Sequence, residues 1–133
     1  MRIKQGEGAL SPQIPKAERY PLFSFRYLQD DSIRKCADKG FLFQFLTRLR
    51  KLSELGWADI AKSHRHAFGF EYLPLVEFRP AVGAGIVTED VSKLAVFRAT
   101  DDNRIFAGVR AGDVFHVIFV ETRFGDICPH SGG

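Results

Sequence analysis

Three short runs of alternating hydrophobic character in the second half of the chain constrain its fold most strongly. They cover Lys93 to Ala99, Arg104 to Ala111 and Val114 to Thr122. Alternation with a period of two is typical of β-strands that bury one face. The runs are joined by Asp101-Asp102-Asn103 and by Gly112-Asp113, and turns this short cannot carry a parallel crossover. The sequence therefore predicts an antiparallel, three-stranded β-meander.

The register of the last hairpin follows if Gly112-Asp113 is a two-residue loop. Ala111 then lies opposite Val114, and continued pairing makes one sheet face nearly all aliphatic. That face carries Ile105, Ala107, Val109, Ile118 and Val120, and the other carries Phe106, Phe115, Val117 and Phe119 among arginines. Because a helical hairpin covers only one face, we expect it on the aliphatic face. The aromatic face should then stay partly open.

A helical pattern covers Phe41 to Leu55. Asp38 is the expected N-cap of this helix, and Gly56 is the expected C-terminal stop. Trp57 to Lys62 is a second short helix, so the two form a hairpin. The first helix has one apolar stripe, with polar residues opposite it. The stripe consists of Phe41, Leu42, Phe45, Leu46, Leu49 and Leu52.

The N-terminal segment has a different composition from the rest of the chain. Residues 1–21 are rich in Gly, Pro, Ser and charge, which predicts a flexible arm whose residues up to Lys16 are dispensable for folding. Alternation at Phe23, Phe25 and Tyr27 predicts an early strand, which Asp30-Asp31-Ser32 ends. A length of 133 residues suits one core. We therefore expect one α+β domain over residues 22–133, with the helical hairpin packed on an antiparallel sheet that ends in the meander.

Composition narrows the classes of function only slightly. The net charge of +3 permits binding to nucleic acid or to an acidic protein without requiring either. Cys36 and Cys128 form neither a zinc framework nor a disulfide scaffold, and no phosphate loop, dinucleotide fingerprint, zincin motif or hydrolase elbow is present. We expect no cofactor and no metal. The sequence has no secretory signal and no apolar run of about 20 residues, which predicts a soluble cytoplasmic protein without a membrane segment.

Histidines, arginines and one glutamate are the residues best suited to chemistry. Ser63-His64-Arg65-His66 is the densest cluster, and with Glu71 it could bind phosphate or supply a general acid and base. The alternative is a solvated polar connection, and metal binding is less well supported because further ligands are missing. His116, within an apolar strand, suits a core histidine better than a catalyst. His130, after Pro129, could reach a site from the chain end.

Arginines on the meander strands form the second candidate group. Arg98, Arg104 and Arg110 lie on strands, where a long cation must reach solvent or find an anion. The guanidinium fork suits phosphate, so several such residues on one sheet could grip an RNA backbone. The alternative pairs Arg104 with Glu121 and leaves the other two at the sheet edge.

The order of these elements resembles the RelE/ParE toxin superfamily. An early strand, a helical hairpin and a final meander with strand arginines and a late histidine span about Leu22 to His130 in the same layout. In RelE-like ribonucleases, basic sheet residues hold messenger RNA while an acid and a base promote attack of the ribose 2′-hydroxyl. The chain lacks the late aromatic residue and the lysine-rich strand of many members.

The resemblance implies a small, metal-independent endoribonuclease toxin with RNA and an antitoxin as partners. Arg98 and Arg110 would stabilise the phosphorane-like charge, His66 or His130 would donate the proton, and Glu71 would be the base. The RNA-binding residues implied are Arg65, Arg98, Arg104, Arg110 and Arg123. ParE-like relatives act on proteins, so a competing hypothesis is an interaction module that binds a replication or transcription factor.

Overall fold

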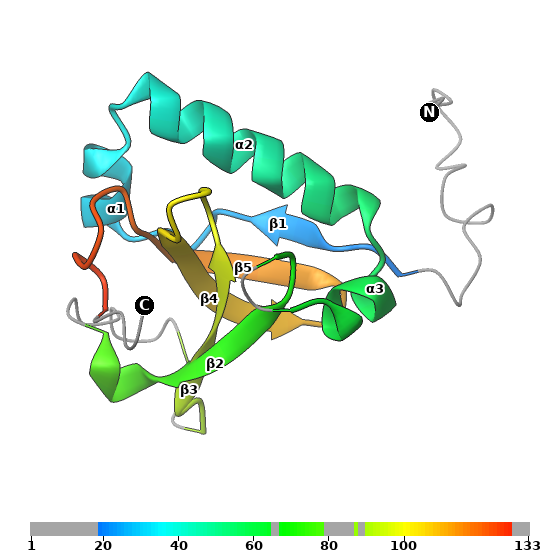
Figure 1. The fold of residues 1–133 in the computed structure, drawn as a ribbon. Coiled ribbons are helices and arrows are strands. Elements are labelled where there is room, and N and C mark those ends of the chain that lie inside the picture. The colour runs from blue at the N-terminus through cyan, green and yellow to red at the C-terminus, as the bar shows by residue number, and fades with distance from the viewer. Residues whose placement is uncertain (1–18, 65–66, 79–86, 88–89, 129–133) are drawn as a thin grey trace, which may run out of the picture.

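The sheet is mixed and has five strands. The computed structural model describes residues 19–64, 67–78, 87 and 90–128, and it places the strands in the order β1-β5-β4-β3-β2 (Figure 1). All pairs are antiparallel except β1 with β5, which are parallel. The predicted α+β class and terminal meander are confirmed. The strands are β1 (Leu22–Ser24), β2 (Phe70–Pro74), β3 (Lys93–Arg98), β4 (Ile105–Ala111) and β5 (Val114–Val120).

The predicted hairpin register holds at the turn and then changes. Ala111 pairs with Val114 and Val109 with His116, around a turn in which Gly112 has a φ of 64°. After Gly108 pairs with Val117, however, Ala107 pairs with Phe119, so Ile118 is an extra residue. This is a β-bulge, which reverses the face on which later residues of the strand point. The expected pairings of Ala107 with Ile118 and of Ile105 with Val120 are therefore wrong.

The helices cover the aromatic face of the sheet, which corrects the expectation that they would cover the aliphatic one. Phe106 and Phe115 are fully buried against α2, and the bulge brings Val120 into the same cluster. Rings such as these bury more area than aliphatic side chains, so this face gains most from cover. The aliphatic face is also closed, because Phe78, Ile127 and Cys128 pack on it. The expectation of an open arginine and aromatic face is therefore wrong.

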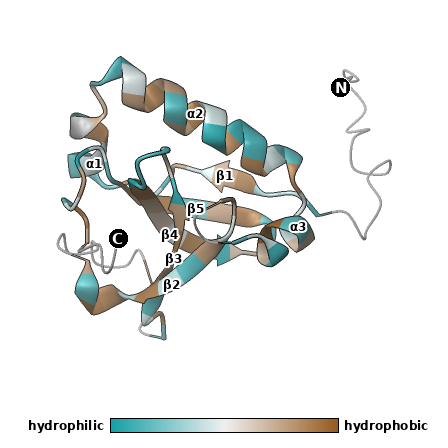
Figure 2. Cartoon of the chain, viewed as in Figure 1, coloured by the Kyte–Doolittle hydropathy of each residue, from teal (hydrophilic) through white to brown (hydrophobic). Residues whose placement is uncertain are grey.

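The long helix α2 spans Lys39–Glu54, and its predicted N-cap is confirmed by a 2.9 Å hydrogen bond from the Gly40 amide to the Asp38 carboxylate. Its buried stripe is narrower than predicted. Leu42 and Leu46 are 39% and 69% exposed, whereas the buried residues are Phe41, Phe45, Leu49 and Leu52. Figure 2 shows this mixed hydrophobic and hydrophilic character along α2 above the largely hydrophobic inner strands.

The second helix of the hairpin, α3, spans Trp57–Lys62 as predicted. Gly56, expected to stop α2, is the N-cap of α3, while Leu55 is the C-cap of α2. None of the helices in the described ranges has the length and apolar character needed to cross a bilayer. The predicted arm, apart from its last residues, lies outside the described residues.

The segment after β1 departs from the sequence prediction. The early strand ends at Ser24, and the expected break at Asp30-Asp31-Ser32 is the start of helix α1 (Asp30–Lys35). Two carboxylates in the first turn suit the positive end of a helix, which explains why they begin one. Ser32 is buried, and its hydroxyl accepts a 3.0 Å hydrogen bond from the Val120 amide. A short 3₁₀ helix, η2 (Leu75–Glu77), follows β2.

Replacing Leu49 with Ala should lower the free energy of unfolding by roughly 2 to 5 kcal/mol. Leu49 lies on the buried side of α2, so the shorter side chain leaves a cavity in the core. Chemical denaturation measures the change. Leu46→Ala on the exposed side of the same helix is the control, and it should change the stability by about 0.5 kcal/mol or less. Equal stability of the two variants would contradict the placement of α2.

Candidate functional site

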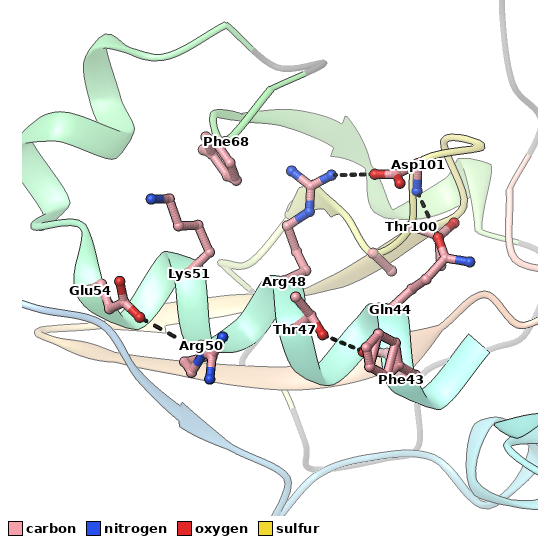
Figure 3. A pocket seen from close by; sticks show the side chains of 11 residues that line it. Phe43, Gln44, Thr47, Arg48, Arg50, Lys51, Glu54, Phe68, Thr100 and Asp101 are labelled. Atoms are coloured by element: carbon pink, nitrogen blue, oxygen red, sulfur yellow. Dashed lines mark hydrogen bonds and ion pairs between the residues drawn. The ribbon is translucent and has the colours of Figure 1, made fainter. Parts of the chain in front are cut away.

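A pocket of about 480 Å³ lies beside α2, on the flank that faces the β3–β4 turn and the segment before β2 (Figure 3). Its basic residues are Arg48, Arg50 and Lys51, all from one turn of α2. Phe43 and Phe68 contribute rings, and Glu54 and Asp101 contribute carboxylates. The volume lies within the range of pockets that bind small ligands.

Arg48 is the organising residue of the pocket. One guanidinium nitrogen donates a 2.6 Å hydrogen bond to the Ala67 carbonyl, and another lies 3.6 Å from the Asp101 carboxylate. Its charged group also lies 4.9 Å from the centre of the Phe68 ring, a cation–π contact. Burial lowers the pKa of Arg48 and the Asp101 carboxylate opposes that shift, while an arginine guanidinium keeps its proton in proteins. The site therefore keeps a fixed positive charge beside an aromatic ring.

The β3–β4 turn forms the opposite wall. The Asp101 amide donates a 3.2 Å hydrogen bond to the Gln44 side chain, which ties this turn to α2. Asp102 accepts hydrogen bonds from the Thr100 hydroxyl and from Arg104. Burial raises the pKa of Asp102, but these hydrogen bonds outweigh it and hold the pKa below its usual value. At neutral pH the ionised Asp102 carboxylate therefore stabilises the turn through these hydrogen bonds.

Lys51 differs from its two basic neighbours. Arg48 lies near Asp101, and Arg50 lies 3.8 Å from Glu54. Within the described part of the chain, Lys51 forms no ion pair. A lysine ammonium at the rim of a pocket is a mobile point charge that an anionic ligand can engage without first breaking a pair.

Two of the predicted catalytic residues, Arg98 and Glu71, lie together on the aliphatic face. Their charged groups are 3.5 Å apart, and the Arg98 side chain is only 7% exposed. The Arg98 Nε group is buried and has no hydrogen-bond partner among the residues that the structure describes. Nearby Cys128 has its pKa raised to about 11, by burial above all and then by Glu121, so its thiol is protonated at neutral pH. An arginine buried in this way does not offer its fork to an RNA backbone.

Arg110 lies far from this pair. It belongs to the helix-covered face, where its guanidinium stacks 3.9 Å from the centre of the Trp57 ring. Arg98 pairs with Ile105, and Arg110 lies five residues further along β4, or about 17 Å at roughly 3.3 Å per residue. The expectation that Arg98 and Arg110 stabilise one phosphorane is therefore wrong, because they occupy opposite faces and opposite ends of the sheet.

The remaining predicted residues are scattered. Arg104 pairs with Asp102 at 3.0 Å and donates to the Thr122 carbonyl, which replaces the pairing with Glu121 that the sequence allowed. Arg123 is exposed beside Asp38 and Asp126. His116 is half-buried against Tyr27 on the sheet. Three predicted site residues lie outside the described residues, namely Arg65, His66 and His130.

Neither a protein-family model, nor a curated protein, nor a solved structure matches this chain. Sequence reasoning missed the α2 pocket because Gln44, Arg48 and Lys51 were assigned to a solvated helix face. One signal was present, since an arginine and a lysine on one polar flank, near an exposed phenylalanine, are the residue types that bind nucleic acid.

Proposed function

We propose that this protein is an RNA-acting toxin of the RelE kind that holds RNA in the α2 pocket. The observation that carries the proposal is the combination of Arg48, Arg50 and Lys51 with aromatic rings around one cavity of nucleotide-binding size. Contacts between cationic side chains and the RNA phosphates supply most of the affinity of such binding, and aromatic rings add stacking with the bases. The layout of the elements supports the RelE comparison.

The proposal assigns RNA binding to the α2 pocket and not to the sheet arginines that the sequence indicated. Arg98 is buried in its ion pair with Glu71, and Arg110 is stacked on Trp57, whereas the α2 pocket is open to solvent. In the proposed reaction, which needs no metal, the ribose 2′-hydroxyl attacks the adjacent phosphate and gives its proton to solvent, while the bond from phosphorus to the 5′-oxygen breaks. The products are a 2′,3′-cyclic phosphate and a 5′-hydroxyl, whose oxygen takes up a proton from the donor. His66 or His130 is the proton donor that the resemblance implies.

The proposal is tested by induced expression in a bacterial host, followed by mapping of RNA ends and by RNA binding at several salt concentrations. We expect growth arrest, new RNA ends, and an affinity that falls as salt rises, because phosphate contacts release counterions. His66→Ala and His130→Ala should slow cleavage more than binding if they transfer protons. Binding that does not respond to salt would contradict the assignment of these cations.

A protein target is the second candidate function, and one surface favours it. Leu42 and Leu46 are exposed on the flank of α2 away from the pocket, and Phe25 lies beside that flank with its ring 6.4 Å from that of Phe45. Exposed apolar residues that adjoin one another are typical of protein interfaces. Growth arrest without new RNA ends would favour this function over the ribonuclease.

A further inference from the structure

We infer that the α2 pocket selects single-stranded RNA, with one unpaired base stacked on Phe43 and the neighbouring phosphates held by Arg50 and Lys51. This inference rests on the proposed function and adds the class of RNA that the pocket accepts. The observation behind it is the exposed ring of Phe43, since most other phenylalanines in the described core are buried.

Phe43 is 70% exposed at the rim of the pocket. It projects from the solvent-exposed side of α2, and its carbonyl accepts a 2.7 Å hydrogen bond from the Thr47 hydroxyl. The ring is therefore displayed on a rigid backbone, although leaving so large an apolar surface in water costs free energy. A flat ligand that covers the ring recovers that cost, and every base has a face suited to it.

The spacing of Phe43 and the two cations along α2 suits a single RNA strand that lies parallel to the helix axis. Arg50 is seven residues beyond Phe43, close to two helical turns, so both residues point to the same side of α2. The rise between them is about 10 Å, and Lys51 lies one residue further toward the pocket. A short stretch of extended strand can therefore place a base on Phe43 while its phosphates lie near the two cations.

A duplex does not fit this arrangement. Its bases are paired and stacked, so their faces cannot reach the Phe43 ring without being pulled out of the helix. The α2 pocket, at about 480 Å³, is the size of a small-ligand site and is walled by the β3–β4 turn. Charge alone would bind both forms of RNA, so the ring is the feature that distinguishes them.

The test uses the full chain and a fluorescent 2′-O-methyl RNA of about ten nucleotides, which cannot be cleaved through its 2′-hydroxyl. Binding is measured for the single strand and for the same strand in a duplex. Phe43→Ala should weaken single-strand binding roughly five- to a hundred-fold, whereas Phe43→Trp should retain it. Leu46→Ala, which removes a similarly exposed apolar side chain of α2 that does not line the pocket, should bind like the wild type.

Three outcomes would overturn one or both ideas. Equal, salt-sensitive binding of single strand and duplex, unchanged by Phe43→Ala, would overturn the selection of single strands and leave the proposed RNA binding standing. A loss of binding in Leu46→Ala equal to that in Phe43→Ala would also overturn the role of the ring. No binding of either RNA would overturn the proposed function itself.

Discussion

Replacing Arg50 and Lys51 together with Ala should remove growth arrest and weaken RNA binding by about tenfold or more at low salt. Both side chains are exposed at the rim of the pocket, and each exposed contact with a phosphate contributes up to about 1 kcal/mol, so the loss of two contacts accounts for a change of this size. The log-log dependence of affinity on salt should become less steep by about 1.4, since each lost contact with single-stranded RNA removes roughly 0.7. Alanine favours helices, so α2 should keep its stability.

The matched control is Arg34→Ala with Lys62→Ala. Both residues are exposed and lie on α1 and α3, outside the α2 pocket, and the pair removes the same two positive charges. Net charge alone therefore does not distinguish the two variants. If the control loses toxicity to the same degree, overall charge and not the pocket determines the effect.

Replacing Gly108 with Ala should lower the free energy of unfolding by about 3 kcal/mol or more, at the upper end of what overpacking costs. A Cβ atom at this position would lie 1.9 Å from the His116 carbonyl oxygen, which belongs to the neighbouring strand. No side chain can rotate away to relieve that contact, because the obstacle is backbone. The two strands must separate locally at the bulge, where the register changes.

Chemical denaturation and amide exchange of the β4–β5 pair measure this effect. Gly56→Ala is the control, since its added Cβ would meet only the Arg19 carbonyl, at 3.4 Å, an ordinary contact distance. That variant should lose about 1 kcal/mol or less, as expected for Ala at an N-cap. Wild-type stability in Gly108→Ala would mean that β4 and β5 pair in another register.

The regular parts of the fold could be predicted because their signals are local. The short helix predicted over Trp57 to Lys62 has the observed ends of α3, and alternation located the three meander strands to within one or two residues. The bulge at Ile118 gives no such signal, since Phe-His-Val-Ile-Phe-Val suits either face of a strand. The helix-covered face was not predictable from this pattern either, because both sheet faces are apolar and the larger rings gain more from cover.

The site was less predictable than the fold, because it depends on contacts between distant segments. Arg48 meets Ala67 and Asp101 only after α2 packs across the sheet. The sequence indicated Arg98 and Glu71 as candidate catalytic residues, but the cover on their side of the sheet comes in part from a segment after β5 that has no regular pattern. Residue type alone therefore identified the arginines and not their accessibility.

The parallel pairing of β1 with β5 has a consequence for biosynthesis. Leu22 lies opposite Val114 and Ser24 lies opposite His116, so about ninety residues that separate the partners must leave the ribosome before β1 can pair with β5. Contacts this distant in sequence slow folding, because the loop must close before the pairing stabilises it. The hydrogen bond from the Val120 amide to Ser32 spans a similar distance. A nascent chain thus stays incomplete, and its pocket unsupported, until nearly the whole domain has been synthesised.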